Sequence, residues 1–397
     1  MEDDYSQKTR FELISLCKEK HLKGYSGKNK DQLLILLSDD QMSVEEIPTT
    51  KICRLNYIGS KFQLLDWLTA TIVEKTGYKT FDNLRIADLF AGTGIVSYHF
   101  RNKNATVISN DAELYSSIIT HAFTKSVFTD KCNNLICELQ KDIEDGRHLT
   151  TTGFVTTHYS LEGSERKFFT IDNARRIDYL RNRIENLKNT IVDDEYRFLL
   201  ASLLISADAV SNVPAVYGCF LKNFKSKALK DLKLIPIHRM TTKAVEGSDT
   251  FQFNILETSF LRSFESDIVY LDPPYNERQY SKNYFPLNII AKTPSQLLVE
   301  EPLKGKTGIP TDCFISPFCK KGDTVENAFD LLFRELKTKW IFLSYNSESL
   351  VSKDKMVEIM GKYGIVSVME RDYKRFKSFD YNKDVTICEY LFCLKKN

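Results

Sequence analysis

The chain has 397 residues, enough for two or three domains, and its 42% hydrophobic content supports a buried core and excludes wholesale disorder. The formal net charge is only +2, so any contact with nucleic acid must use locally concentrated cations. No apolar run reaches the ~20 residues of a membrane helix. The chain begins Met-Glu-Asp-Asp, unlike a signal peptide, and its nine cysteines lack a Cys-x-x-Cys pair. We therefore expect a soluble, intracellular and cytoplasmic protein with no membrane partner.

The first 40 residues are predicted to form a separate helical hairpin. Thr9 and Glu12 have the capping-box spacing at the start of one helix, and a second helix is expected over 28–37, after a glycine-bounded turn. Residues 8–30 carry seven Lys or Arg against two Glu, so the hairpin is locally basic. This charge pattern is typical either of a solvated helix face or of a surface that contacts nucleic-acid backbone.

The same segment resembles the SAP motif, a small DNA-binding module. The resemblance rests on the pattern Leu-x-x-x-Cys-x-x-x-x-Leu-x-x-Tyr-Ser-Gly-x-x-Lys within residues 9–37. It implies contacts with the DNA backbone, which add affinity but little sequence information. Residues 41–50 are polar and contain proline, and they are predicted to be a linker to the main domain.

The segment Asn-Tyr-Ile-Gly-Ser-Lys at residues 56–61 is the first candidate site, and it precedes an apolar helix. Lys61 has the charge and the reach to hold a carboxylate such as that of a methionine moiety. Tyr57 is suited to pack on a cofactor. The alternative is an ordinary Gly-Ser helix N-cap followed by a surface lysine.

A glycine turn between a strand and a helix is the second candidate. A buried strand is expected over 84–90, and Gly92 and Gly94 lie in the turn that follows, where the missing Cβ lets a ligand approach the backbone. A second strand over 105–109 is followed closely by Asp111, whose carboxylate suits the two hydroxyls of a ribose. Serine replaces the third glycine of the dinucleotide-binding fingerprint, and the pattern fits either NAD or S-adenosylmethionine.

Strands that alternate with helical segments indicate an α/β fold with a mostly parallel, Rossmann-like sheet. Later strands are expected at 267–271, 339–345 and 386–394. The main domain is predicted to comprise residues 51–145 and 251–397, with a largely helical region inserted at 146–250.

The inserted region is predicted to contain helices near 172–190 and 195–210. Residues 166–183 carry six Lys or Arg against two Asp, and residues 222–239 carry six against one. Aromatic residues lie among these cations, a combination that suits phosphate contact and base stacking. Exposed helix faces with core aromatics behind them explain either segment equally well.

The run from Ile268 to Tyr275 carries the most chemical information. A short β-branched strand ends in Asp272, Pro273, Pro274 and Tyr275. The prolines stiffen the backbone and leave its carbonyls free to accept hydrogen bonds, and an acid at the carboxyl end of a strand lies where open α/β sheets bind ligands. The tyrosine adds a flat face for stacking. These groups predict a clamp for a planar amine such as that of adenine, and the alternative is a plain Pro-Pro turn.

Four motifs follow one another in the order Tyr-Ile-Gly-Ser-Lys, Asp-Leu-Phe-Ala-Gly-Thr-Gly, Ser-Asn-Asp and Tyr-Leu-Asp-Pro-Pro-Tyr-Asn. In this order they are similar to the motifs of D12-class, Dam-like adenine-specific DNA methyltransferases, and most similar to members from type II restriction–modification systems. The resemblance spans residues 51–397. It implies an S-adenosyl-L-methionine-dependent fold that modifies double-stranded DNA, with a cognate restriction endonuclease as a functional partner. We also expect a monomer, because one adenine is methylated at a time.

The resemblance implies roles for individual residues. Tyr57 and Lys61 contact S-adenosylmethionine, Asp111 takes the ribose hydroxyls, and Asp272 lies between cofactor and target base. The pocket of the cofactor is shaped by Asp88, Phe90, Gly92 and Gly94. A further family acid near the cofactor adenine is replaced by Asn254 in this chain, and no metal ligand set is predicted.

The predicted reaction is methyl transfer to the N6 amine of adenine, whose lone pair is delocalised into the ring. The Asp272 carboxylate and the Pro273 carbonyl are expected to accept its two N–H bonds, with the base flipped out of the duplex and stacked on Tyr275. Alternatives are an RNA adenine methyltransferase, a cytosine-N4 methyltransferase, a non-catalytic DNA-binding protein and an NAD oxidoreductase. Cytosine enzymes usually carry serine at the position of Asp272, and the missing glycine argues against NAD.

Overall fold

The computed structural model describes residues 8–19, 30, 33, 52–241, 243–297, 303, 305–374 and 386–397. The chain divides into two compact units, Met1–Lys51 and Ile52–Asn397. In the part of the chain that is described, no helix combines the length and the apolarity needed to cross a membrane. The nine cysteines are free thiols.

Helix α1 (Arg10–Glu19) of the first unit begins with the predicted capping box. The Thr9 N–H donates to Glu12 Oε2 at 2.7 Å, and the Glu12 N–H donates to Thr9 Oγ1 at 3.4 Å. Apart from helical Lys30 and Leu33, the predicted second helix at 28–37 lies outside the described residues, as does the linker at 41–50.

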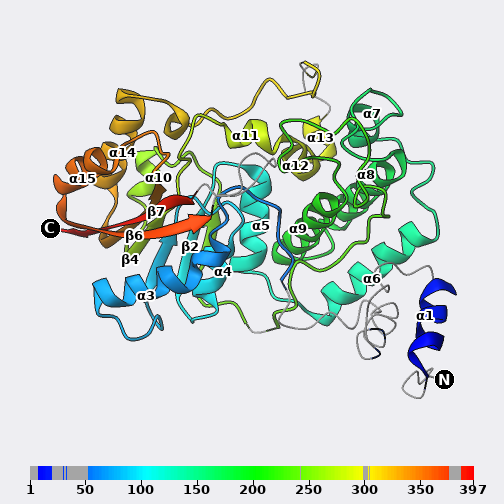
Figure 1. Ribbon diagram of the computed structural model, residues 1–397, viewed down its shortest axis with the longest axis horizontal. Coiled ribbons are helices and arrows are strands. Elements are labelled where there is room, and N and C mark those ends of the chain that lie inside the picture. The colour runs from blue at the N-terminus through cyan, green and yellow to red at the C-terminus, as the bar shows by residue number, and fades with distance from the viewer. Residues whose placement is uncertain are drawn as a thin grey trace. The chain divides into compact units, whose positions relative to one another are not determined.

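The second unit is built on a seven-stranded sheet with the strand order β3-β2-β1-β4-β5-β7-β6 (Figure 1). The strands are β1 (Arg85–Asp88), β2 (Thr106–Asn110), β3 (Asp249–Phe251), β4 (Ser266–Leu271), β5 (Thr338–Asn346), β6 (Gly364–Lys374) and β7 (Thr386–Lys396). Neighbours from β3 to β5 run parallel, and β7 runs antiparallel to both β5 and β6. The predicted α/β fold with a mostly parallel sheet is confirmed.

The central strands are apolar on both faces because helices cover both faces of the sheet. In β4, Ile268 and Tyr270 pack into one apolar cluster, and Val269 and Leu271 pack into another on the opposite face. The first cluster includes α3 (Leu65–Thr76) and α4 (Ile95–Arg101), and the second includes α10 (Thr258–Leu261), α14 (Asp323–Glu335) and α15 (Lys353–Gly361). Continuous apolar runs of this kind are typical of buried parallel strands.

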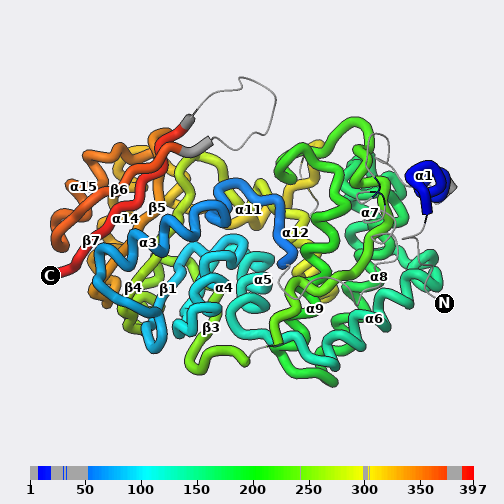
Figure 2. The backbone as a smooth tube through the Cα atoms, turned by 60° about the horizontal axis from the view of Figure 1, so that its bottom comes forward, coloured from blue at the N-terminus to red at the C-terminus, as the bar shows by residue number. Residues whose placement is uncertain are grey.

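A helical block lies beside the sheet, and α5 is its helix nearest the sheet (Figures 1 and 2). Its helices are α5 (Leu114–Thr124), α6 (Asp130–Glu144), α7 (Phe154–Tyr159), α8 (Ile171–Leu187), α9 (Asp193–Ala209), α11 (Tyr280–Asn283), α12 (Phe285–Ala291) and α13 (Pro294–Leu297). The predicted helices near 172–190 and 195–210 are thus confirmed as α8 and α9. One apolar core joins α5 and α6 to α8, α9 and α12, so the block takes in residues on both sides of the predicted 146–250 insertion.

Two strands were not predicted from the sequence. Strand β3 has only three residues, too few to give a recognisable periodicity. Strand β6 alternates between Val366 and Val368, which pack against the core, and more exposed neighbours, but its second half is charged. Both strands extend the sheet at its edges, where burial and therefore the apolar signal are weakest.

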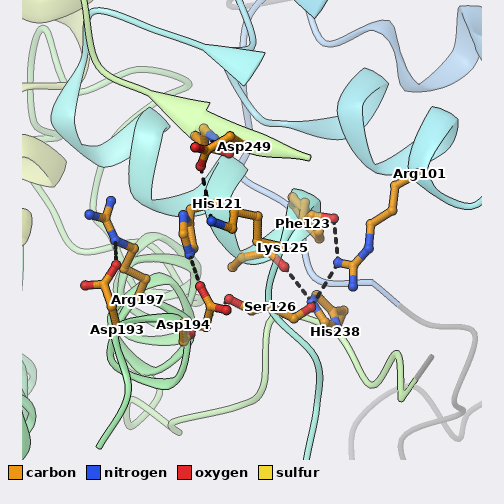
Figure 3. A network of polar contacts seen from close by, with 12 residues as sticks. Arg101, His121, Phe123, Lys125, Ser126, Asp193, Asp194, Arg197, His238 and Asp249 are labelled. Carbon is orange, nitrogen blue, oxygen red and sulfur yellow. Dashed lines mark hydrogen bonds and ion pairs between the residues drawn. The ribbon is translucent and has the colours of Figure 1, made fainter. Parts of the chain in front are cut away.

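A polar network joins α5 to the start of α9 (Figure 3). His121 and Asp194 are hydrogen-bonded at 2.7 Å, Lys125 pairs with Asp249 at 3.2 Å, and Arg197 pairs with Asp193 at 2.7 Å. The ligand atoms of His121, Asp193 and Asp194 lie close enough to surround a cation. Because each carboxylate already has a basic partner, the network is explained as a joint between the sheet side and the helical block.

Candidate active site

One cavity opens at the carboxyl ends of the parallel strands, near the boundary of β1 and β4 where the strand order reverses. Open α/β sheets bind ligands at such a switch point. Nearly all of the residues predicted from sequence line this cavity: Tyr57, Lys61, Asp88, Phe90, Gly92, Asp111, Asp272, Pro273, Pro274 and Tyr275. Asn254 lines it too. The fold therefore gathers five separate segments of the chain around one space.

Gly94 is the exception, because it does not line the cavity. Both Gly92 (φ +53°) and Gly94 (φ +71°) have left-handed backbone angles that favour glycine. A Cβ at Gly92 would lie 3.2 Å from the Tyr57 ring, whereas one at Gly94 would lie 2.9 Å from the Cα of Thr120 on α5. The absence of a Cβ at Gly92 thus lets the Tyr57 ring lie close to the backbone of the turn. The absence of a Cβ at Gly94 permits close packing of α4 on α5.

Asp88 ends β1 and is buried beneath the glycine turn. Its Oδ2 accepts hydrogen bonds from Ser97 N at 3.1 Å and Ser97 Oγ at 2.6 Å. Its Oδ1 is buried and has no partner among the described residues. Burial raises the pKa of Asp88 to about 7, against the opposing effect of Ser97. A donor or a cation in the cavity would satisfy the orphaned oxygen.

Asp111 follows β2 and is held by backbone donors. Its Oδ2 accepts from Gly92 N at 2.8 Å, and its Oδ1 accepts from Glu113 N at 2.9 Å. Burial raises the pKa of Asp111, and these hydrogen bonds oppose the shift. The adjacent Glu113, which was not predicted, also lines the cavity, and burial raises its pKa to about 7. The sequence could have indicated that Glu113 lines the cavity, because it lies only two residues after Asp111.

Lys61 and Asp272 form a buried ion pair between the two motifs. The Lys61 ammonium lies 2.7 Å from Asp272 Oδ1 and donates to the Gly59 carbonyl at 2.9 Å. Burial alone would lower the pKa of Lys61, but the charges of Asp272 and Glu389 raise it. Burial raises the pKa of Asp272, and Lys61 opposes that shift. Ser60 makes no side-chain capping hydrogen bond, so the plain N-cap alternative does not describe this segment.

A cluster of tyrosines, not predicted from the sequence, holds the segment that carries Lys61. The Tyr57 ring stacks on Tyr284 with centroids 4.6 Å apart, and Tyr115 donates its hydroxyl to that of Tyr57 at 3.2 Å. Tyr284 accepts from Ile58 N at 3.0 Å, and Tyr280 donates to the Ile58 carbonyl at 3.4 Å. The four-residue spacing of Tyr280 and Tyr284 just after the Asp-Pro-Pro-Tyr motif could have indicated this cluster.

The family description "D12 class N6 adenine-specific DNA methyltransferase" matches residues 57–359, which is most of the chain. The chain belongs to this family. The predicted methyltransferase activity, adenine specificity and DNA substrate of this D12-class enzyme are thereby confirmed, and S-adenosyl-L-methionine is its methyl donor. The NAD oxidoreductase alternative is ruled out.

Individual relatives support the assignment of this D12-class methyltransferase. This chain is 42% identical over 340 residues to type II methyltransferase M.CviAII of Paramecium bursaria Chlorella virus 1. The alignment covers 85% of this chain and 98% of the relative. The chain is 38% identical to M.NlaIII of Neisseria lactamica, covering 86% and 99% of the two chains. M.FokI of Planomicrobium okeanokoites is 32% identical, but this chain covers only 53% of that protein.

The cavity of this D12-class methyltransferase fits its cofactor by the chemistry of its donors and acceptors. Buried Asp88 Oδ1 is an unused acceptor for a cationic group, and the Asp111 carboxylate is an acceptor suited to ribose hydroxyls. Gly92 allows close approach to the backbone, and Phe90 and Phe253 contribute apolar walls.

Proposed function

We propose that this cavity holds S-adenosylmethionine beside a flipped-out target adenine, with separate residues serving each ligand. On the cofactor side, Asp88 accepts from the methionine ammonium and Asp111 accepts from the ribose hydroxyls. Tyr57, Phe90 and Gly92 shape the walls, and Gly94 acts through packing. The orphaned Asp88 oxygen, buried inside the cavity, is the observation that carries the cofactor side of the proposal.

On the target side, Asp272 and the Pro273 carbonyl accept the two N–H bonds of the adenine amine. S-Adenosylmethionine, when bound, supplies an electrophilic methyl group on a sulfonium centre. The Asp272 carboxylate strengthens its hydrogen bond as positive charge develops on the amine, so it favours the transition state over the ground state. Pro273 and Pro274 restrict the backbone that carries these acceptors, and Tyr275 stacks on the base after it leaves the duplex.

Lys61 is proposed to link the two halves of the site. Its ammonium occupies one Asp272 oxygen at 2.7 Å, which leaves the other oxygen for the substrate. This contact orients Asp272, and it is compatible with the expected contact between Lys61 and the cofactor, because an ammonium has three donors.

DNA recognition is proposed to involve the helical block and the basic N-terminal hairpin, which resembles the SAP motif. Within residues 166–183, several cations are paired internally: Arg175 with Glu162, Arg176 with Asp172, Arg181 with Glu185 and Arg183 with Asp142. These pairs favour a structural role for that segment. A groove lined by Lys167, Lys222, Lys306 and Phe220 instead offers cations beside an aromatic ring, as backbone contact requires.

The biological setting is proposed to be a restriction–modification system in the cytoplasm. M.CviAII and M.NlaIII, which this chain matches over nearly their whole length, are both named type II methyltransferases. The enzyme is proposed to act as a monomer on double-stranded DNA, alongside a restriction endonuclease that reads the same sequence. The division into a catalytic part (51–145 and 251–397) and a recognition part (146–250) is retained as a functional proposal.

The substitution Asp272→Ala tests the catalytic assignment. Labelled methyl transfer to duplex DNA should be abolished, while binding of S-adenosylmethionine and of DNA remains measurable, because Asp272 acts on the reacting amine. Structured RNA serves as the alternative substrate in the same assay, and product nucleosides identify the methylated base. Normal turnover by the variant, or methylation of RNA in preference to DNA, would contradict the proposal.

A further inference from the structure

We propose that Glu389 is a positioning residue of the methyl-transfer site, whose negative charge acts on the buried Lys61 ammonium and through it helps to orient Asp272. The inference rests on the proposed role of Asp272. Glu389 lies on β7, beyond residues 57–359 that match the family description. No sequence motif near it pointed to a role in the site.

Glu389 is buried next to the catalytic cavity. Only 7% of its surface is exposed, although a carboxylate is among the side chains least often buried without a partner. It lines a groove together with Tyr57, Lys61 and Tyr275, and these three residues also line the catalytic cavity. The C-terminal strand thus brings a second carboxylate to the groove that Lys61 lines.

The neighbouring strand β5 places a polar side chain opposite this carboxylate. Glu389 faces Asn346 across the antiparallel β5/β7 pair. The Asn346 side-chain oxygen accepts from Glu348 N at 3.0 Å, which leaves its amide nitrogen to donate to Glu389. The Asn346 amide therefore turns its nitrogen toward Glu389, and the β5/β7 register sets which residue the carboxylate faces.

The charges explain why a second carboxylate is needed. Lys61 is only 7% exposed, and an uncompensated ammonium is costly to bury. While one Asp272 oxygen stays on Lys61, its other oxygen accepts from the adenine amine, so Asp272 shares its charge between the two, and Glu389 supplies the remaining counter-charge. Burial raises the pKa of Glu389, Lys61 opposes this shift, and the charge of Asp272 adds to it. The groups that act on Glu389 are therefore Lys61, Asp272 and Asn346, and the charge of Glu389 in turn acts on Tyr270 and Tyr275.

The test compares Glu389→Gln, which keeps the shape and removes the charge, with Glu389→Asp, which keeps the charge. In single turnovers at saturating S-adenosylmethionine, we expect Glu389→Gln to slow methylation by about 10- to 100-fold, since misplacement of a reacting group costs this much. The dissociation constant for S-adenosylmethionine and the melting temperature should change little. Glu389→Asp should recover part of the rate.

The matched control is Glu370→Gln on the neighbouring strand β6. Glu370 is exposed and pairs with Lys353 at the surface, so this variant should methylate at the wild-type rate. A wild-type rate for Glu389→Gln would overturn the inference. So would equal losses of rate, cofactor affinity and melting temperature in Glu389→Gln and Glu389→Asp, since that pattern indicates a structural role.

Asp272→Ala, measured in parallel, separates this inference from the proposed function. If Asp272→Ala is inactive while Glu389→Gln is normal, only the role of Glu389 fails. If Asp272→Ala is active, the catalytic assignment itself fails, and the role of Glu389 fails with it.

Discussion

The cofactor side and the target side of the site are built differently. On the cofactor side, Asp88, Gly92 and Asp111 come from two adjacent strand–turn units and are held by local backbone donors such as Gly92 N and Glu113 N. On the target side, Asp272 is oriented by Lys61, more than 200 residues earlier in the chain, and by a carboxylate from the last strand. The groups on the cofactor side are therefore close together in the sequence, whereas the groups on the target side come from segments that are far apart in the sequence.

The largest effect on the methylation rate is expected for Lys61→Met, which removes the ammonium that contacts Asp272. Loss of the ammonium removes the charge that lowers the pKa of Asp272, so burial raises this pKa further. Methylation at neutral pH should fall by about 100-fold or more, and the rate should recover partly as pH rises and Asp272 ionises. Rate–pH profiles of the variant and the wild type measure this effect. An unshifted profile would mean that Lys61 acts only on the cofactor.

A substitution in the glycine turn at Gly94 should lower the free energy of unfolding more than a substitution at an unpacked glycine. Gly94→Ala forces a left-handed residue and a contact with Thr120, so it should cost about 2–4 kcal/mol of unfolding free energy. Gly77→Ala is the matched control: its φ is +75°, but nothing lies within 4 Å of the new Cβ, so about 1–2 kcal/mol is expected. Denaturant unfolding compares the two. Equal costs would show that α4 and α5 can separate without penalty.

Asp88 should make the free energy of unfolding depend on pH. Its pKa of about 7 in the folded protein lies above the ordinary value of 3.8, so its contribution to stability is complete below about pH 4 and is lost as pH rises through 7. Asp88→Asn should therefore flatten the fall in unfolding free energy between pH 5 and pH 8, measured by denaturant titration. A slope equal to that of the wild type would assign the dependence to Glu113 and Asp111.

The smallest effect is expected at the groove of the helical block. Lys222→Gln should weaken DNA binding a few-fold and reduce the salt dependence of the binding constant by about one unit, as loss of one phosphate contact does. Arg183→Gln, whose guanidinium pairs with Glu138 and Asp142, is the control and should leave the salt dependence unchanged. Fluorescence anisotropy at several salt concentrations would detect the difference. A reduced salt dependence in Arg183→Gln but not in Lys222→Gln would indicate that α8, and not the groove, contacts the DNA backbone.

The sequence by itself determined the strand–turn–helix units and the chemistry at their ends. Short apolar, β-branched runs indicated β1, β2, β4, β5 and β7, and acids or glycines that follow the first three of these strands indicated key residues of the cavity lining. These features are local, because a short apolar run bounded by turn residues can be recognised from near neighbours in the sequence.

Only the tertiary structure decided which groups meet. The Lys61–Asp272 pair, the Tyr57–Tyr284 stack and the approach of Glu389 depend on strand order and on the pairing of β7 with β5. The tertiary structure also places Gly94 in the α4–α5 contact and not in the cavity wall, and it pairs all four arginines of α8 with acids. No periodicity encodes such contacts, because they join residues whose separation in sequence carries no information about their distance in space.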